Sequence, residues 1–524
     1  MKLIGLRFLA LSSALSIAVA CSQAATSPRY GGTLRVELRQ SLVSFDPREW
    51  QPGTTESATN EKLAALVFDR LVALDNYGRA QPQLATEWSH DPAFKRWQFT
   101  IRAGVKFSDG SALTTADVAA ALQPLLSSTQ QISVSPNAVI YQSTVPLPDL
   151  LEELSSGRYF IYRSQPGGGL LGTGAFFVSE STTSPLDGKV SRYKLSANDS
   201  CWAGRPFLDA IELTLNIPAL RALFDLQLAR ADLIELSPEL VRRATQENLR
   251  VWSSSPLRLF ALRFDDAQFA TSDARLREAL SLSLDRNTMA GVLLQKQAEP
   301  AAALLPQWLS GYAFLFTVDT NLNRAKEIRA ALPANAAAGV QPLRLRVDAP
   351  SDIAKLLRER VAVNARQALL VVQVVGRATP RGSVGNASTT SDPSAGVHLF
   401  EWHYSSLSPR AELASLFSVL NPAASLDDVN SATTPEQLYA VEKRLLDERR
   451  VLPLIALPEF AGVGRDVRDW MPSRWGDWHL ADVWLDRPQS QPQSSGAINP
   501  ENAAPTSEAR SPRSTQLAVQ GAHP

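Results

Sequence analysis

Cysteine is scarce in this chain: Cys21 and Cys201 are the only two among 524 residues. Two cysteines cannot build a disulfide-rich scaffold or a four-cysteine zinc site. The five histidines have no spacing suited to zinc, so we expect no metal site. Basic and acidic side chains are equal in number, 52 each, and this balance argues against electrostatic binding to nucleic acid.

Long apolar runs are also lacking, with one exception near the N-terminus. Lys2 and Arg7 precede the run from Phe8 to Ala20, which is too short to span a bilayer comfortably and ends in small residues. We therefore expect residues 1–20 to be an export signal and the protein to lie in the periplasm or cell envelope. Removal of this leader leaves 50 basic and 52 acidic side chains.

Cys21 directly follows this run, and the segment resembles a lipobox, whose cysteine is lipidated and becomes the mature N-terminus. On this interpretation a lipid on Cys21 tethers the protein to a membrane, residues 21–28 form a linker, and Cys201 is unpaired. Ordinary signal peptidase cleavage after Ala18-Val19-Ala20 is the alternative. If the leader is cut elsewhere, a disulfide between Cys21 and Cys201 stays open.

Motifs for catalysis are few and poorly placed. The S-x-x-K pattern at Ser191–Lys194 lies in a predicted strand and has no accompanying K-T-G. Gly167, Gly169 and Gly172 satisfy G-x-G-x-x-G, but a strand-like segment follows them where a dinucleotide site requires a helix. A Walker loop and a G-x-S-x-G elbow are both lacking. We expect no catalytic residues and no cofactor, and the protein is predicted not to be an enzyme.

The chain does contain clear periodic segments. Trp97 to Ile101 alternates apolar and polar residues and predicts a half-buried strand, and Ser108–Gly110 is a turn. A helix is expected next, capped by Thr114 with Asp117 near the capping-box position.

Further along the chain, strands and helices alternate. The elements that we expect are strands at 32–38 and 343–347, a buried strand at 369–375, and helices at 61–71, 353–368 and 434–449. The strand-helix-strand order over 343–375 implies a parallel sheet covered by helices. From residue 487 to 524 the chain is rich in Pro, Ser, Gln and Ala, and we expect it to be disordered.

Several of these segments together resemble one family. The resemblance rests on residues 69–72, 82–88, 97–110, 115–118, 172–176, 202–209 and 273–286. In this order and spacing they are similar to the extracellular solute-binding proteins of family 5, which serve ABC importers for peptides, dipeptides and nickel.

The resemblance implies an α/β fold: a periplasmic-binding-protein-like (type II) two-lobed clamshell with an extra subdomain in the first lobe. Ligand enters between open lobes and shifts the population to a closed form that docks on a permease. The expected boundaries are 29–46, 186–262 and 462–486 for lobe I, 47–185 for its subdomain, and 263–461 for lobe II.

The segment Leu399–Pro409 falls where peptide-binding members of this family carry an Asp that pairs with the ligand's terminal ammonium. Alignment on Trp402 and Pro409 places Ser405 at that Asp. One interpretation is that Glu401, or another acid nearby, takes over the task. The other is that the ligand has no free terminal ammonium or that the protein no longer binds small ligands; Trp402 and Tyr404 then offer aromatic faces.

The resemblance also places the loop 48–59 beside the ligand cleft. Trp50 and Glu56 are candidate contacts in this loop, and a solvated loop with one packed tryptophan is the alternative. The predicted function is the substrate-binding component of an ABC transporter, a monomer that delivers a peptide or peptide-like solute to permease subunits. A non-transport periplasmic binding, chaperone-like or sensor protein is the alternative.

Overall fold

The computed structural model describes residues 27–42, 44–51, 53–166, 168–184, 190–265, 273–332, 343–348, 351–375, 396–420 and 426–487. The predicted signal peptide, Cys21, most of the predicted linker and the tail from residue 488 onward lie outside the described residues. So does the loop predicted over 376–395.

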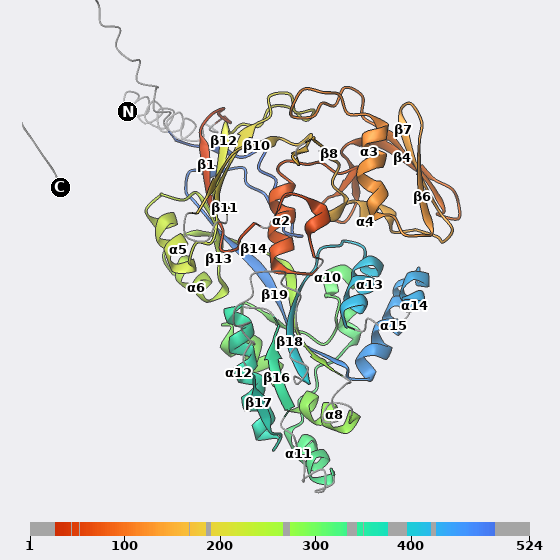
Figure 1. The fold of residues 1–524 in the computed structure, drawn as a ribbon. Helices are drawn as coiled ribbons and strands as arrows, with labels where there is room; N and C mark the ends of the chain where they lie inside the picture. Colours follow the sequence, from red (N-terminus) through yellow and green to blue (C-terminus); the bar gives the residue numbers. More distant parts are fainter. Residues whose placement is uncertain are drawn as a thin grey trace, which may run out of the picture. The chain divides into compact units, whose positions relative to one another are not determined.

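A mixed sheet forms the core of lobe I (Figure 1). Its strands are β10 (Phe176–Thr183), β11 (Val190–Ala197), β12 (Ala210–Thr214), β1 (Thr33–Glu37) and β13 (Leu233–Leu236), in that order. β1 is parallel to both of its neighbours, whereas β10 and β11 are antiparallel additions. α5 (Ala219–Gln227) and α6 (Pro238–Gln246) cover this sheet near β13. The strand predicted at 32–38 is confirmed by β1.

Two long antiparallel strands, β14 (Arg250–Phe264) and β19 (Val451–Val463), run from lobe I into the second lobe. Their register is irregular between Ser253 and Arg258, where Pro256 stands opposite Pro458. Because proline has no backbone N–H, the ladder is interrupted there. The sequence-based lobe boundary at 262/263 lies further along β14 than this irregularity.

Lobe II continues the same sheet beyond β14 with β18 (Val397–His403), β16 (Leu343–Val347) and β17 (Val372–Val374). Its other elements include β15 (Glu299–Pro300), α8 (Ala274–Ser283), α9 (Arg286–Thr288), α10 (Gln307–Ser310), α11 (Leu322–Ala331), α12 (Asp352–Gln367), α13 (Pro409–Leu420), α14 (Asp427–Ser431) and α15 (Pro435–Asp447). The helices lie on both faces of the sheet (Figure 1). The predicted helices at 353–368 and 434–449 are confirmed by α12 and α15.

The subdomain of lobe I has its own four-stranded antiparallel sheet. Its strands are β4 (Ala85–His90), β5 (Arg96–Ile101), β7 (Ala138–Ser143) and β6 (Gln130–Val134), and its helices are α3 (Thr115–Leu122) and α4 (Leu150–Leu154). The small pairs β2 (Val72–Leu74) with β3 (Ala80–Pro82), β8 (Arg163–Ser164) with β9 (Leu170–Leu171), and β20 (Val467–Arg468) with β21 (Trp484–Leu485) complete lobe I. The capping box predicted at Thr114 and Asp117 is present at α3.

The helix predicted at 61–71 is wrong in both of its ends. The observed helix, α2 (Thr55–Ala64), begins earlier because the Thr54 side chain accepts a hydrogen bond from the Ser57 N–H. It ends earlier because the Leu66 and Val67 carbonyls accept hydrogen bonds from the N–H groups of Phe176 and Gly174 and not from the next turn of the helix. A Cβ on Gly174 would lie 2.7 Å from the Val67 carbonyl carbon, so only glycine allows this approach.

The buried strand predicted at 369–375 is also wrong in extent and in environment. β17 covers only Val372–Val374, and within the described residues it is the edge strand of the sheet, paired in parallel with β16. Leu369 and Val371 are 63% and 55% exposed. An apolar run is an ordinary sign of burial, but here part of it forms an edge strand with exposed side chains.

Candidate functional site

α2 lies where lobe I meets the strands that cross into lobe II. Most of its side chains are small or apolar and are buried, including those of Ala58, Asn60 and Leu63. Glu61 and Lys62 are the charged exceptions in its last turns, and both are half-buried. A helix enclosed on most sides places these charges inside the protein, where they must face partners or a cavity.

A cavity of about 40 Å³ lies on one side of α2, between the lobes. We call it the Ser405 cavity. Lobe I contributes to it from α2, from the turn before Tyr159 and from the loop after β20, whereas lobe II contributes the end of β18 and its neighbours. The polar or charged residues that line it are Glu61, Lys62, Arg70, Ser155, Ser156, His403, Tyr404, Ser405 and Asp477.

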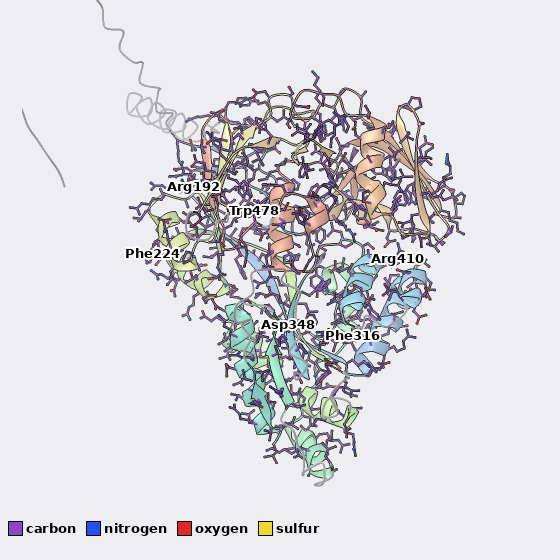
Figure 2. All side chains as sticks on the ribbon, in the orientation of Figure 1. Arg192, Phe224, Phe316, Asp348, Arg410 and Trp478 are labelled. Atoms are coloured by element: carbon purple, nitrogen blue, oxygen red, sulfur yellow. The ribbon has the colours of Figure 1, made fainter. Side chains whose placement is uncertain are left out.

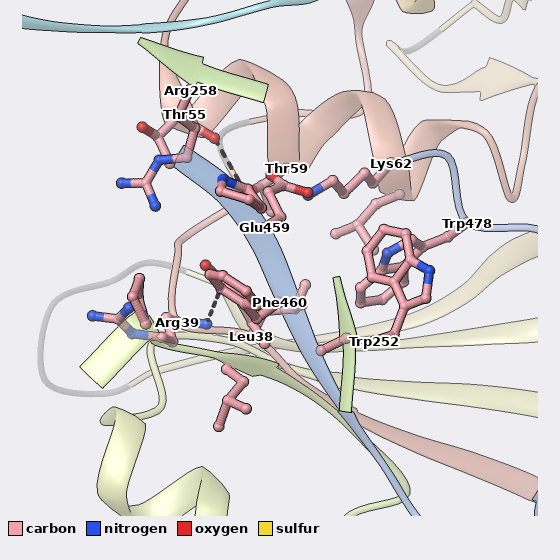
Figure 3. Close-up of a pocket in the computed structure, with 16 residues that line it drawn as sticks. Leu38, Arg39, Thr55, Thr59, Lys62, Trp252, Arg258, Glu459, Phe460 and Trp478 are labelled. Atoms are coloured by element: carbon pink, nitrogen blue, oxygen red, sulfur yellow. Dashed lines mark hydrogen bonds and ion pairs between the residues drawn. The ribbon is translucent and has the colours of Figure 1, made fainter. Parts of the chain in front are cut away.

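A second cavity, of about 30 Å³, lies on the other side of α2 (Figure 3). We call it the Trp252 cavity. Charged side chains from α2 and from the crossing strands line it together with Trp252 and Trp478. Lys62 belongs to the walls of both cavities, so α2 is the partition between them. None of the residues that the sequence singled out as ligand contacts lines this second cavity.

Glu459 of β19 joins the charges on the two sides. Its carboxylate pairs with the Lys62 ammonium and lies 2.9 Å from Nε2 of His403. Burial by itself would raise the pKa of Glu459, but Lys62 and His403 outweigh it and hold that pKa well below its usual range. Glu459 is therefore ionised at neutral pH and ties α2 to both β18 and β19.

Arg70 and Asp477 form a second ion pair at the wall of the Ser405 cavity, with 3.3 Å between Arg70 Nη1 and Asp477 Oδ2. The Arg70 guanidinium also lies 4.6 Å from the centre of the Phe160 ring. Burial opposes ionisation of Asp477, yet Arg70 lowers its pKa overall. Asp477 thus has its counter-charge within lobe I, whereas Nε of Arg70 is buried without a hydrogen-bond partner.

Glu401, a predicted ligand contact, instead links the lobes. Its side chain is 2% exposed and accepts hydrogen bonds from Arg258 Nε at 2.7 Å and from Thr55 Oγ1 at 2.9 Å. Burial works against the charge, but Arg258 lowers the pKa of Glu401. The carboxylate lies against an arginine of its own lobe and the first residue of α2, and it lines neither cavity.

Trp402 is also buried in this structure, with 2% of its surface exposed. Its indole N–H donates to Glu412 Oε1 at 2.5 Å, and its ring packs on Gly53. A Cβ on Gly53 would lie 2.3 Å from this ring, and the Gly53 carbonyl accepts a hydrogen bond from the His403 N–H. The indole faces these neighbours and does not line either cavity.

Tyr404 and Ser405 are the two predicted contacts that line the Ser405 cavity. The Tyr404 hydroxyl donates to the Leu304 carbonyl at 2.5 Å, which fixes its ring. The N–H groups of Ser405 and Ser406 donate to Oε2 of Glu412 at 3.1 and 2.7 Å. Burial raises the pKa of Glu412 to about 7, despite these donors.

Trp50 and Glu56 lie apart from this cavity. The Trp50 indole N–H donates to the Ser44 carbonyl at 2.9 Å, and its ring contacts Phe160 edge-on. Glu56 is half-buried in the first turn of α2, where a carboxylate is favoured by the helix dipole. The structure therefore places Tyr404 and Ser405 at the Ser405 cavity, whereas Trp50, Glu56, Glu401 and Trp402 do not line it.

The site residues predicted from the sequence do not include Glu61, Lys62, Arg70, Glu459 or Asp477. A signal was available for one of them, because Glu459 interrupts the apolar run from Leu452 to Val463 and a buried carboxylate needs a partner. The others could not be identified from the sequence, because their position at the cavity depends on how α2 and the loop after β20 pack against β18.

The weak catalytic patterns have structural uses. Ser191 and Lys194 both lie on β11, where Ser191 Oγ donates to the Thr182 carbonyl and Lys194 pairs with Glu180. Within the described residues, no group of three or more His, Cys, Asp or Glu side chains could hold a metal ion. Cys201 is a free, half-buried thiol, and burial raises its pKa. No helix in the described part of the chain combines the length and apolar character that crossing a membrane requires.

Comparison with known proteins identifies the family. The model of the bacterial extracellular solute-binding proteins, family 5, matches residues 79–418, which is more than half of the chain. The periplasmic oligopeptide-binding protein OppA of Haemophilus influenzae is 32% identical over 110 residues, which cover 20% of each chain. The nickel-binding periplasmic protein of Escherichia coli is 24% identical over 258 residues, covering 43% of this chain and 47% of that protein. These curated relatives are therefore matched over less than half of their length.

Solved structures agree over a longer span. NikA from Brucella suis, in complex with Fe(III)-EDTA, superposes with a TM-score of 0.71 at 20% identity and covers 87% of this chain and 100% of that one. Haemophilus influenzae OppA, in complex with RPPGFSPFR, gives a TM-score of 0.69 at 16% identity, covering 88% and 100%. At these identities the likeness concerns the fold, and it confirms the predicted type II two-lobed clamshell. With its motifs, its fold and the match to the family model in agreement, the chain belongs to the bacterial extracellular solute-binding proteins of family 5.

Proposed function

We propose that this protein is the substrate-binding component of an ABC transporter, which captures a peptide or peptide-like solute between its lobes and delivers it to a membrane permease. The observation that carries the proposal is the Ser405 cavity, because residues of both lobes form its walls. A ligand held there contacts both lobes at once and therefore favours the closed form.

The crossing strands supply the means of opening. Pro256 and Pro458 face each other where the β14–β19 ladder is irregular, and Glu459 N–H there donates to the Ser254 hydroxyl instead of to a backbone carbonyl. A rotation at this point changes few backbone hydrogen bonds. Hinge closure of two lobes around a ligand follows the same geometry in periplasmic binding proteins.

The polar walls suit a peptide. Peptide-binding proteins hold an extended ligand through backbone hydrogen bonds and leave varied side chains in wet pockets. The relatives support this class of ligand: H. influenzae OppA was crystallised with RPPGFSPFR, and the dipeptide-binding protein of Pseudoalteromonas sp. SM9913 was crystallised with Met-Leu. The proposed chemistry is binding alone, with no bond made or broken in the cavity.

The proposal includes export and tethering. The apolar leader and Cys21 favour a lipoprotein of the cell envelope or periplasm, with the lipid as its membrane contact. The permease subunits are the proposed protein partners, the binding protein acts as a monomer, and the charge balance gives nucleic acid no part.

One observation favours the second candidate, a non-transport binding, chaperone-like or sensor protein. The cavities on either side of α2 measure about 40 and 30 Å³, which is room for a few water molecules and not for a peptide. Ion pairs such as that between Arg410 and Asp149 hold the lobes together around them. A transport protein must open this arrangement to admit its ligand.

Native mass spectrometry of the full chain, purified without denaturant from the cells that produce it, tests the main proposal. We expect a population carrying added mass that dissociates on activation and sequences as short peptides. Protein found only at its own mass, whose melting temperature is unchanged by pools of dipeptides to pentapeptides, contradicts ligand capture and favours the second candidate.

A further inference from the structure

The carboxylate of Glu61 faces the Ser405 cavity from α2. Gly157, on the opposite wall, gives it the space: a Cβ on that glycine would lie 2.6 Å from the Glu61 carboxyl carbon. Any larger residue at this position would push the carboxylate away. The close packing on Gly157 thus leaves the Glu61 carboxylate beside the cavity that Ser405 also lines.

Among the described residues, no hydrogen-bond donor or cation contacts the Glu61 carboxylate directly. Two of the cations nearby are engaged elsewhere: Lys62 pairs with Glu459, and Arg70 pairs with Asp477. The third, Arg158, is exposed, and its guanidinium lies 5.7 Å from the centre of the Tyr159 ring. A half-buried carboxylate with no direct partner is unfavourable, because water no longer solvates it fully and no protein group replaces the water. A positively charged ligand group would supply the missing partner for this carboxylate and lower its free energy.

The electrostatics agree with the geometry. Burial raises the pKa of Glu61 to about 8, and Arg70 and Arg158 counteract this only in part. Asp477 and Glu412, the nearby acids, raise it further. A cation placed in the cavity therefore stabilises the ionised form of Glu61 more than it would stabilise a carboxylate that already has a partner.

We propose that Glu61 is the acidic anchor for the ammonium group of the bound peptide and that it replaces the Asp which the family carries where this chain has Ser405. The inference rests on the proposed function, since it requires a ligand in this cavity. Glu401 is excluded from the role because its carboxylate is paired with Arg258 and lies outside the cavity. The anchor has moved from lobe II to α2 of lobe I, across the same small space.

The size of the cavity fits a terminal ammonium. A primary ammonium is close to a water molecule in size, and about 40 Å³ accommodates about three water-sized groups. The hydroxyl of Ser405 is uncharged and can only accept or donate a hydrogen bond beside the ammonium. Asp477, the other carboxylate at this cavity, is paired with Arg70, so the charge comes from Glu61. The remainder of the peptide lies outside this small space.

The test uses two probes: a random tripeptide pool with free N-termini and the same pool after N-acetylation. Peptides retained by the full chain after gel filtration are counted by mass spectrometry. We expect the wild-type protein to retain the free-amine pool and to retain the acetylated pool at least tenfold less, because one charged hydrogen bond is lost.

The variant Glu61→Gln, which keeps the shape of the side chain, should lose retention of the free-amine pool by about tenfold to a hundredfold. Glu442→Gln is the matched control. Glu442 is also a buried carboxylate with a raised pKa, but it lines neither cavity, so retention should be unchanged. If Glu61→Gln does not fold, Glu61→Asp replaces it, since its shorter side chain withdraws the charge and should also lower retention.

The double variant Glu61→Gln with Ser405→Asp tests the position of the charge. If the two residues serve one ammonium, the new aspartate should restore the preference for free-amine peptides, which a purely structural role of Glu61 would not predict. Equal retention of both pools by the wild type, or an unchanged preference in Glu61→Gln, overturns the inference and leaves peptide binding intact. Retention of neither pool by the wild type overturns the proposed function and the inference with it.

Discussion

Arg410 of lobe II and Asp149 of the subdomain of lobe I form an ion pair that joins the two lobes. Arg410, in the first turn of α13, donates from Nε to Asp149 Oδ1 at 3.2 Å, and the Ser408 hydroxyl donates to the same carboxylate. Figure 2 shows Arg410 at the end of α13 that faces the subdomain. Both side chains of the pair are at least 80% shielded from solvent.

The first prediction concerns this pair. Asp149→Asn leaves the Arg410 guanidinium without its counter-charge, and an unpaired buried charge destabilises by on the order of 3 kcal/mol. Opening of the lobes hydrates the guanidinium, so we expect the variant to shift toward the open form. Small-angle scattering should give a larger radius of gyration than for the wild type.

The control is Asp75→Asn, which breaks the exposed ion pair with Arg79 inside lobe I. This change should leave the radius of gyration unaltered, because exposed pairs contribute little. An Asp149→Asn protein with the scattering curve of the wild type would show that this pair does not hold the lobes together.

The second prediction compares two glycines that have nearly the same backbone conformation. Gly53 has φ +77° and Gly78 has φ +79°, so an alanine at either position has the same penalty for the left-handed region, about 1 kcal/mol. A Cβ on Gly78 would have no neighbour within 4 Å, whereas a Cβ on Gly53 would meet the Trp402 ring. Gly53→Ala should therefore lower the free energy of unfolding by on the order of 2 kcal/mol more than Gly78→Ala.

Urea unfolding of both variants measures this difference. Near-ultraviolet circular dichroism should also change in Gly53→Ala alone, because the Trp402 indole must move. Equal destabilisation of the two variants would mean that the loop before α2 can shift away from Trp402 without loss.

The third prediction concerns pH and Glu442, which is fully buried and accepts hydrogen bonds from the N–H groups of Leu304 and Leu305 and from the Tyr312 hydroxyl. Burial raises the pKa of Glu442 to about 7 from the ordinary 4.5. A raised pKa in the folded state means that the contribution to stability is complete below pH 4.5 and is lost as the pH rises toward 7. The loss is on the order of 3 kcal/mol for one such group.

Glu442→Gln should remove this dependence, because glutamine has no charge to lose and its carbonyl can still accept the two backbone donors. Urea unfolding at pH 5 and pH 7.5 measures it: the difference in free energy between the two pH values should be smaller in the variant. Glu412, with its pKa near 7 for the same reason, keeps part of the slope. A variant with the full slope of the wild type would contradict the assignment.

The fourth prediction tests the cap of α3. The Thr114 hydroxyl accepts from the Asp117 N–H, and the Asp117 carboxylate accepts in return from Thr114 and also pairs with Arg163. Thr114→Ala should lower the free energy of unfolding by about 1 kcal/mol. Thr182→Ala, at an exposed position of β10, is the control, and it should change the free energy of unfolding by much less. Equal effects of the two substitutions would show that the Thr114 cap does not stabilise α3.

Local signals were enough to predict α3, α12, α15 and β5, because each carries its own cap or period in the sequence. α2 shows where such signals stop. The apolar run through Leu66 and Val67 continues the helical pattern, and only the close approach of Gly174 from a distant part of the chain ends the helix. The edge position of β17 is likewise a property of the assembled sheet.

The site divides in the same way. The family motif led to Tyr404 and Ser405, which do line the cavity between the lobes. Glu61 is the first residue of the helix predicted at 61–71, but nothing near it in the sequence points to Gly157 or to a cavity between the lobes, so the sequence does not single it out. Glu401 illustrates the opposite case: its type and position suggested an anchor, but Arg258 on the adjacent strand β14 takes its charge.

The two strands that cross between the lobes also determine the order in which the two lobes can fold during synthesis. Lobe II is built from one continuous stretch between Pro256 and Pro458, whereas lobe I takes β1 from the beginning of the chain and β21 from near its end. A ribosome releases the N-terminus first. Lobe I therefore cannot complete its fold until β21, which ends at Leu485, has been synthesised, whereas lobe II can fold earlier.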